Sequence, residues 1–309
     1  MDELKSEHWM ERFAEWMRLR NWTQGTIETY RVGVLQFFDY LRSQGVQSLT
    51  EMSRELIEGF RSHLYYRRHR GKNLAVSTQA TRLLAAKAFV KFLVRENLLL
   101  VDWSASVDLP KSPEKLPRVL AEDEVIRLLE APDVSTLKGI RDRAILETFY
   151  ATALRNGELR RLCLEDIDRE HSALWVHLGK GQKSRMVPIG EEALAWLEEY
   201  LRRVRPQYLA RDGQQIVFLS PNGVPLRRSC IVRILARYAA QVQLPGATAH
   251  TLRHSCATHM LRRGAELRHL QEMLGHNSPV TTQHYTQVDL TDLHKVVRRC
   301  HPRERKWFS

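Results

Sequence analysis

The sequence predicts a mainly α-helical protein with a small β-sheet, divided into an N-terminal helical domain and a larger α+β domain. Apolar residues recur at helical spacing over most of the 309 residues. Two segments near the middle, 173–178 and 184–189, alternate with the period of strands. Between the two parts lies a stretch with three prolines, which cannot continue a helix. A chain of this length can bury two ordinary cores.

The first domain, residues 1–105, is expected to be a small bundle of four helices joined by short connections. In the fourth of these, Leu83, Phe92 and their apolar neighbours recur every 3.6 residues. The predicted helices cover residues 8–19, 26–42, 53–68 and 77–96. The proline-containing stretch, residues 106–118, is then an extended linker to the second domain, residues 119–309.

A run of basic and aromatic residues ends the third predicted helix, from Tyr65 to Lys72. Such a run suits a phosphate backbone and sugar edges, although a solvated basic helix end explains it equally well. The next helix starts with polar residues that could enter a DNA groove. The candidate DNA contacts in this domain are Arg67, Arg68, Arg70, Lys72, Thr78 and Arg82.

In the second domain, the two alternating segments are expected to form a hairpin with Lys180 at its tip. A flexible cation there could reach into DNA. Lys183 and Arg185 lie on the same hairpin, are also predicted DNA contacts, and could take the place of Lys180. Around the hairpin the sequence predicts helices over 122–130, 138–148, 191–203 and 227–242, a strand at 216–219, and a turn at Asn156-Gly157 before a short helix.

Three short helices are predicted between His250 and Tyr285. His250 and Arg253 share one face of the first, which Gly264 ends. The second covers about 266–274 and stops at Gly275, so that His276 follows it directly. A third, starting at Ser278-Pro279, carries Tyr285. Imidazoles, a guanidinium and a phenol directed towards one place suit a phosphodiester, because they offer donors for its oxygens and a hydroxyl that can attack phosphorus.

The composition agrees with a polyanionic partner. The net charge is +12, and both halves of the chain are basic, which favours a partner gripped from two sides. The sequence has no run of 18 apolar residues and no signal-peptide core, and its four cysteines are scattered. We therefore expect a cytoplasmic protein without disulfides, membrane spans or structural zinc, and the absence of a carboxylate cluster predicts no metal or cofactor.

The second domain resembles the tyrosine recombinases of the phage integrase family, and among them the Xer recombinases of bacterial chromosomes. Five elements in the family's order carry the resemblance: Leu154-Arg155-x-x-Glu158-Leu, Gly179-Lys180-Gly181, His250-x-x-Arg253-His254, Leu274-Gly275-His276 and Tyr285. The N-terminal part and linker resemble that family's core-binding (SAM-like) domain, so the resemblance covers nearly the whole chain. Two departures, Ala153 for the family's glycine and Gly157 for a serine, leave room for a mobile-element recombinase beside a host Xer protein.

The resemblance implies a role for each matched residue. Tyr285 would attack the scissile phosphate and form a 3′-phosphotyrosyl bond. Arg155 and Arg253 would clamp the non-bridging oxygens, and Lys180 would protonate the leaving 5′-oxygen. His250 would assist the tyrosine, and His276 would donate to a phosphate oxygen. Glu158 would hold Arg155 or His250 in place.

The resemblance also implies an assembly: a homo- or hetero-tetramer on two DNA duplexes with specific core sites, acting through a Holliday junction in the bacterial nucleoid. The last helix, with an apolar stripe over 290–297, would dock into a neighbouring protomer, or back onto its own domain. A partner recombinase or accessory protein is possible. The alternatives are relaxation of DNA in the manner of a type IB topoisomerase, and a non-catalytic sequence-specific DNA-binding protein.

Overall fold

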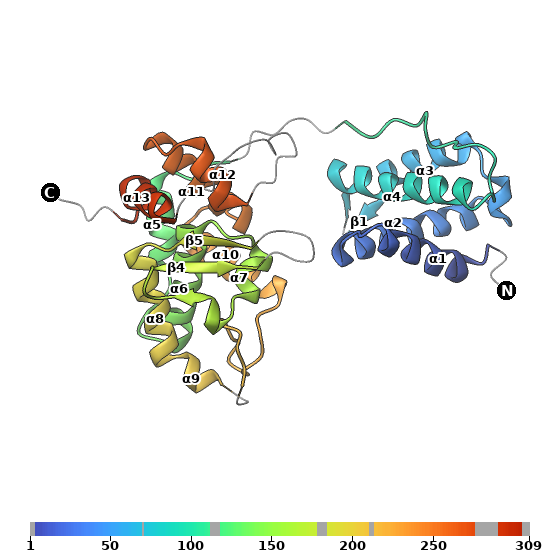
Figure 1. The fold of residues 1–309 in the computed structure, drawn as a ribbon. Helices are drawn as coiled ribbons and strands as arrows, with labels where there is room; N and C mark the ends of the chain where they lie inside the picture. The colour runs from blue at the N-terminus through green and yellow to red at the C-terminus, as the bar shows by residue number, and fades with distance from the viewer. Residues whose placement is uncertain are drawn as a thin grey trace. The chain divides into compact units, whose positions relative to one another are not determined.

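A computed structural model of the chain describes residues 4–69, 71–111, 118–177, 184–209, 213–275 and 290–304 (Figure 1). The chain forms two compact units, Met1–Lys115 and Leu116–Ser309. The first is helical with a two-stranded hairpin, and the second combines helices with a three-stranded antiparallel sheet. The predicted fold class is therefore confirmed. Within the described ranges, no helix combines the length and apolar character needed to cross a bilayer.

The N-terminal unit contains the four predicted helices, with ends that differ slightly from the prediction. They are α1 (Ser6–Leu19), α2 (Gln24–Ser43), α3 (Arg54–Tyr66) and α4 (Val76–Arg95). Helix α2 packs along α4, and α1 and α3 lie against the same pair. The core between them is rich in phenylalanine, since Phe13, Phe37, Phe38, Phe60 and Phe89 are fully buried. Aromatic rings of this size supply most of the apolar area that a small bundle can bury.

The predicted end of the third helix is wrong. Helix α3 ends at Tyr66, and a short hairpin follows, formed by β1 (Arg68–His69) and β2 (Lys72–Asn73). Gly71 lies in the turn with a φ of 77°, a left-handed conformation that costs glycine little. Because the backbone of Arg68 pairs with that of Asn73, it is no longer available for a helix.

The second unit is built around α6 (Leu137–Thr152), whose residues from Gly139 to Thr152 are all buried. Helices α5 (Glu122–Glu130), α8 (Glu191–Arg203) and α11 (Ala249–Arg262) pack against it. The sheet has the order β3 (Ile167–Asp168), β4 (Ala173–Val176) and β5 (Arg185–Pro188), with Leu174 opposite Val187. The remaining helices are α7 (Asn156–Arg161), α9 (Arg205–Tyr208), α10 (Arg228–Gln241), α12 (Leu267–Leu274) and α13 (Leu290–Cys300).

Three local predictions in this unit need correction. Helix α6 continues four residues beyond Thr148, to Thr152, because Phe149 and Tyr150 extend its buried surface. The chain reverses at Ala153 rather than at Asn156-Gly157, which instead form the first turn of α7. Residues 216–219 form only isolated bridges, from Ile216 to Cys163 and from Leu219 to Pro225, and not a strand.

The C-terminal helix α13 lies against its own unit, in contact with β5, α11 and α12 (Figure 1). Leu293 and Val297, from its predicted apolar stripe, are buried there. Just beyond the helix, Arg303 donates to the fully buried carboxylate of Glu147 at 2.6 Å, and Glu147 also pairs with Arg143 at 2.9 Å. An ion pair thus connects the segment directly after α13 to the central helix α6.

Candidate active site

Two arginines and a histidine from the predicted set line one hollow of about 500 Å³. Arg155 is the residue that precedes α7, and His250 and Arg253 lie on the first turn of α11, as their spacing predicted. Thr248 fixes the start of α11, because its hydroxyl accepts a hydrogen bond from the Thr251 amide at 3.1 Å. Apolar residues complete the lining, among them Phe149, Leu154, Val232 and Leu235.

Glu158 connects the arginines of the site. Its carboxylate accepts from both the Arg155 amide, at 2.7 Å, and the Arg155 Nη1, at 2.8 Å. It also accepts two hydrogen bonds from Arg185, at 3.2 and 3.1 Å. Burial alone would raise the pKa of Glu158, but the hydrogen bonds from Arg185 and Arg155 hold it below its usual value. Glu158 is therefore an ionised carboxylate shared by two guanidinium groups.

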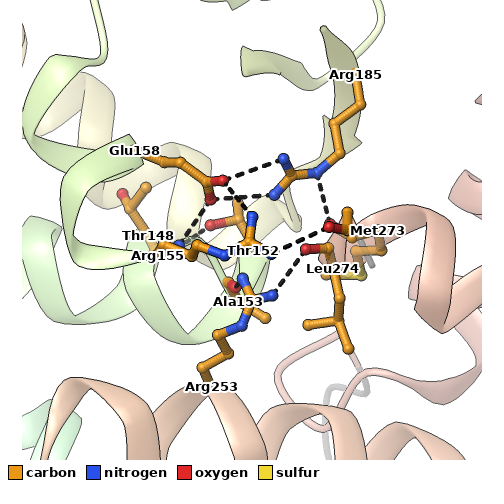
Figure 2. A network of polar contacts seen from close by, with 10 residues as sticks. Thr148, Thr152, Ala153, Arg155, Glu158, Arg185, Arg253, Met273 and Leu274 are labelled. Carbon is orange, nitrogen blue, oxygen red and sulfur yellow. Dashed lines mark hydrogen bonds and ion pairs between the residues drawn. The ribbon is translucent and has the colours of Figure 1, made fainter. Parts of the chain in front are cut away.

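The same arginines, together with Arg253, bind the end of α12 (Figure 2). The last carbonyl groups of a helix have no partner within it, and here three consecutive ones accept from arginine side chains. The pairs are Arg185 Nε to Met273 O at 2.9 Å, Arg253 Nη2 to Leu274 O at 2.7 Å and Arg155 Nη2 to Gly275 O at 3.0 Å. Residues from α7, β5 and α11 thus meet at the point where the chain leaves α12 for His276.

The surroundings of Arg253 oppose its positive charge. Burial, and next the nearby charge of Arg155, lower the pKa of Arg253 to about 10. The Glu158 carboxylate opposes this shift, and the negative end of the α12 dipole is also favourable to cations. Arg253 remains a cation at neutral pH. With 45% of its side chain exposed, Arg155 is the more open of the two to a substrate.

Arg185 does not occupy the position that the hairpin suggested. We expected it to contact DNA or to replace Lys180, but it is buried, and its guanidinium is directed at Glu158 and Met273. Its place in the site was missed, although there was a signal. Arg185 shares the inward face of the alternating strand with Val187, which is fully buried, and an arginine on such a face needs internal partners.

Comparison with known proteins agrees with this arrangement. Residues 118–291 match the model of the phage integrase family, and residues 10–97 match the N-terminal SAM-like domain of phage integrases. The chain belongs to the phage integrase family. It is 37% identical over 298 residues to tyrosine recombinase XerC 2 of Ralstonia nicotianae, covering 95% of this chain and 85% of the relative. It is 36% identical to tyrosine recombinase XerD of Staphylococcus aureus over 282 residues, covering 91% and 94%.

Solved structures of the family share the fold. The XerH site-specific recombinase bound to its difH substrate has a TM-score of 0.67 at 21% identity, covering 97% of this chain and 82% of that one. A lambda integrase tetramer bound to a Holliday junction has a TM-score of 0.65 at 18% identity, covering 92% and 80%. The chain is thus a tyrosine recombinase, an enzyme that cleaves and rejoins DNA strands at specific sites.

Several predicted residues of this recombinase lie outside the described ranges. They are Arg70, Lys180, Lys183, His276 and Tyr285, together with the third short helix expected from Ser278. Their roles stay predictions. The described part of the site is linked to two of them by the chain itself, because Gly275, held by Arg155, directly precedes His276, and Tyr285 follows nine positions later.

The predicted DNA contacts of the N-terminal unit lie around its hairpin and the start of α4. Arg68 and Lys72 are exposed on the hairpin, whereas Arg67, Thr78 and Arg82 are half-buried. Burial and the adjacent Arg67 charge lower the pKa of Arg82. Tyr65 and Tyr66 are exposed beside this hairpin, and their rings contact each other edge to face. This surface is basic and aromatic, and the DNA contacts assigned to its residues stay predictions.

Proposed function

We propose that this recombinase exchanges DNA strands through a covalent bond to Tyr285. The phenol oxygen attacks the scissile phosphorus, forms a 3′-phosphotyrosyl bond and releases a 5′-hydroxyl. Attack by the 5′-hydroxyl of a second duplex reverses the step and rejoins the strands. Because the phosphodiester energy is kept in the tyrosyl ester, no nucleotide cofactor is consumed. One such exchange on two duplexes produces a Holliday junction, and a second resolves it.

One observation carries the proposal: Arg155 and Arg253, from different elements, line the same hollow as His250. Guanidinium groups bind the non-bridging oxygens of a phosphodiester with two parallel hydrogen bonds, and they do so more strongly as charge builds up in the transition state. Removing one donor of this kind typically lowers the rate by roughly 10²–10³.

The proton transfers are assigned to the remaining residues. His250, exposed on the first turn of α11, accepts the proton of Tyr285 or orients its hydroxyl. Lys180 protonates the departing 5′-oxygen, which is otherwise a poor leaving group. His276 donates a hydrogen bond to a phosphate oxygen. Glu158 keeps Arg155 in place through the two hydrogen bonds described above.

We further propose that the protein works as a tetramer on two duplexes in the bacterial nucleoid, with α13 passing to a neighbouring protomer. The relatives include a lambda integrase tetramer bound to a Holliday junction, which supports this arrangement. A partner recombinase, an accessory protein and residence on a mobile element are compatible with the same chemistry. The basic residues Arg67, Arg68, Arg70, Lys72, Thr78, Arg82 and Lys183 are proposed to hold the DNA.

The decisive experiment traps the covalent intermediate. A DNA site is selected by binding from a random pool, nicked so that cleavage releases a short fragment, and incubated with the protein. We expect a slow-migrating complex on a denaturing gel, which Tyr285→Phe abolishes. Tyr238→Phe is the matched control, because the Tyr238 hydroxyl donates to Asp142 within the core of the same unit. It should retain the complex.

The outcomes also separate the alternatives. Specific binding without a covalent complex, with every candidate partner added, would identify a non-catalytic DNA-binding protein. Relaxation of supercoiled DNA with no exchange between two sites would identify a topoisomerase-like enzyme. A complex that survives Tyr285→Phe would show that another residue is the nucleophile.

A further inference from the structure

The side-chain hydrogen bonds of Arg185 in the described structure go to two parts of the candidate site. It lies on β5, and its side chain is 6% exposed. Both Nη groups donate to Glu158, and Nε donates to the carbonyl of Met273 at the end of α12 (Figure 2). The guanidinium therefore uses three of its five N–H donors on Glu158 and Met273. With 6% of the side chain exposed, little of it is open to DNA.

The two partners of Arg185 are the two supports of the proposed phosphate clamp. Glu158 binds the backbone and the side chain of Arg155. The end of α12 binds Arg155 through Gly275 O and Arg253 through Leu274 O. Arg185 thus binds both supports, and each support binds Arg155 or Arg253 directly.

The end of α12 is fitted closely to this guanidinium. A Cβ atom on Gly275 would lie 2.8 Å from Arg185 Nη1 and 2.9 Å from Arg185 Cζ, closer than real Cβ contacts. Gly275 also has a φ of 64°, which ends the helix in the left-handed conformation. The guanidinium therefore lies against bare backbone, at the residue from which the chain continues to His276.

We infer that Arg185 is a positioning residue that fixes Arg155 and the exit of α12 relative to each other, and that it does not contact DNA. The inference rests on the proposed role of Arg155. A planar guanidinium is needed, because it alone can donate two parallel bonds to Glu158 and a third in another direction. A lysine carries the same charge but is a compact point donor without this geometry.

The test compares Arg185→Lys with wild type in three measurements. The dissociation constant for the selected DNA site should change less than about twofold, and its dependence on salt concentration should be unchanged. A lost phosphate contact would instead reduce the logarithmic salt slope by about 0.9. The rate constant of single-turnover cleavage should fall roughly 10- to 100-fold, since displacement of a clamp group by about 1 Å can cost that much.

A double-mutant cycle shows whether Arg185 acts through Arg155. In an Arg155→Lys background, Arg185→Lys should lower the cleavage rate far less than in wild type. The reason is that the Arg155 guanidinium, which Arg185 is inferred to position, is already absent. Arg205→Lys is the matched control. Arg205 is equally buried and donates to a backbone carbonyl, Ile216 O at 3.0 Å, but it lies in α9, away from α12 (Figure 1). Cleavage by this variant should match wild type within about twofold.

Several results would contradict the positioning role of Arg185. Reduced affinity with a smaller salt slope would make Arg185 a DNA contact, and independent, multiplicative rate losses would show that it does not act through Arg155. Amide hydrogen exchange in the DNA-free protein tests the positioning role of Arg185 independently of the cleavage assay. Arg185→Lys should speed exchange at residues 272–275, and Arg205→Lys should not. Unchanged exchange would overturn the inference, whereas absence of any wild-type covalent complex would overturn the proposed function instead. If Arg185→Lys fails to fold, Glu158→Gln is examined in the same way.

Discussion

At the scale of single residues, the catalytic unit buries histidines in a way that couples its stability to pH. The His259 ring bridges two groups: Nε2 lies 2.8 Å from the carbonyl of Leu120, and Nδ1 lies 2.8 Å from the hydroxyl of Tyr150. Because a carbonyl only accepts, Nε2 carries the proton and Nδ1 accepts from Tyr150. His301, after α13, is fully buried, and its ring lies tilted by 58° against the Tyr150 ring with 5.1 Å between the ring centroids.

The pH dependence of stability follows from His301. Burial, and next the charges of Arg303 and Arg263, lower its pKa to about 3. In the unfolded chain the histidine pKa is about 6.5, so the unfolded chain binds a proton at a higher pH than the folded chain does. The free energy of unfolding should therefore fall as the pH drops from 7 towards 3. Between pH 7 and pH 5 the free energy of unfolding, measured with urea, should decrease less in His301→Asn than in wild type, by at most about 2 kcal/mol. An unchanged pH profile would contradict this role of His301.

At the scale of elements, the link between α6 and α7 carries a strained residue in a functional place. Ala153 has a φ of 47°, in the left-handed region, and it is fully buried. Its carbonyl accepts from Arg253 Nη1 at 2.5 Å, so this turn contacts one residue of the proposed clamp. The next residue but one, Arg155, is the other residue of the proposed clamp. The departure from the family's glycine thus falls where glycine would relieve strain.

We expect Ala153→Gly to raise the free energy of unfolding by about 0.5–1 kcal/mol. The left-handed conformation costs an L-residue roughly 1–2 kcal/mol, and the greater freedom of unfolded glycine returns part of that gain. Cleavage should be unchanged, because the carbonyl stays in place. Ala144→Gly, within α6, is the control and should destabilise by about 1 kcal/mol or more. A loss of stability in Ala153→Gly would show that the methyl packing outweighs the strain.

Across the catalytic unit as a whole, α13 and residues 301–304 pack against the core within a single chain. Cys300 and His301 are buried, and Arg303 supplies a positive partner for Glu147. Burial raises the pKa of Glu147, against the lowering effect of Arg303 and Arg143. Any exchange of this segment between protomers would have to replace these contacts with equivalent ones, because an unpaired buried carboxylate is costly.

Removal of residues 289–309 should therefore reduce recombination more than binding to a single DNA site. The reason is that the segment is proposed to connect protomers, whereas the proposed DNA contacts lie in other segments. Band shifts on one site and recombination between two sites measure the two effects. Since the deletion also leaves Glu147 without Arg303, its folding is checked by thermal melting, and Arg303→Gln, which keeps α13, serves as the milder variant. Equal losses in both assays would argue against a role in assembly.

Most of the helices, the fold class and the family could be predicted from the amino-acid sequence, which also gave the candidate catalytic residues. Helical periodicity and end signals are local, so α5, α8 and α12 with its Gly275 stop were predicted closely. The spacing of His250 and Arg253 is also local, and they do share one face. Periodicity failed where pairing decides the outcome: the hairpin at Arg68 and the absent strand at 216–219 depend on hydrogen bonds to other segments.

The hydrogen bonds that hold Arg155 and Arg253 depend on the packing of elements that are distant in the sequence. Arg185 appeared from sequence to be a cation on a hairpin, and its partners lie 27 and 88 residues away along the chain. Arg303 and Glu147 are 156 residues apart. A buried charge is stable only where a partner of opposite charge and hydrogen bonds are brought to it, and that depends on how distant elements pack. Local sequence pattern gave the residues proposed to carry the chemistry, whereas the packing of distant elements shows which residues hold Arg155 and Arg253.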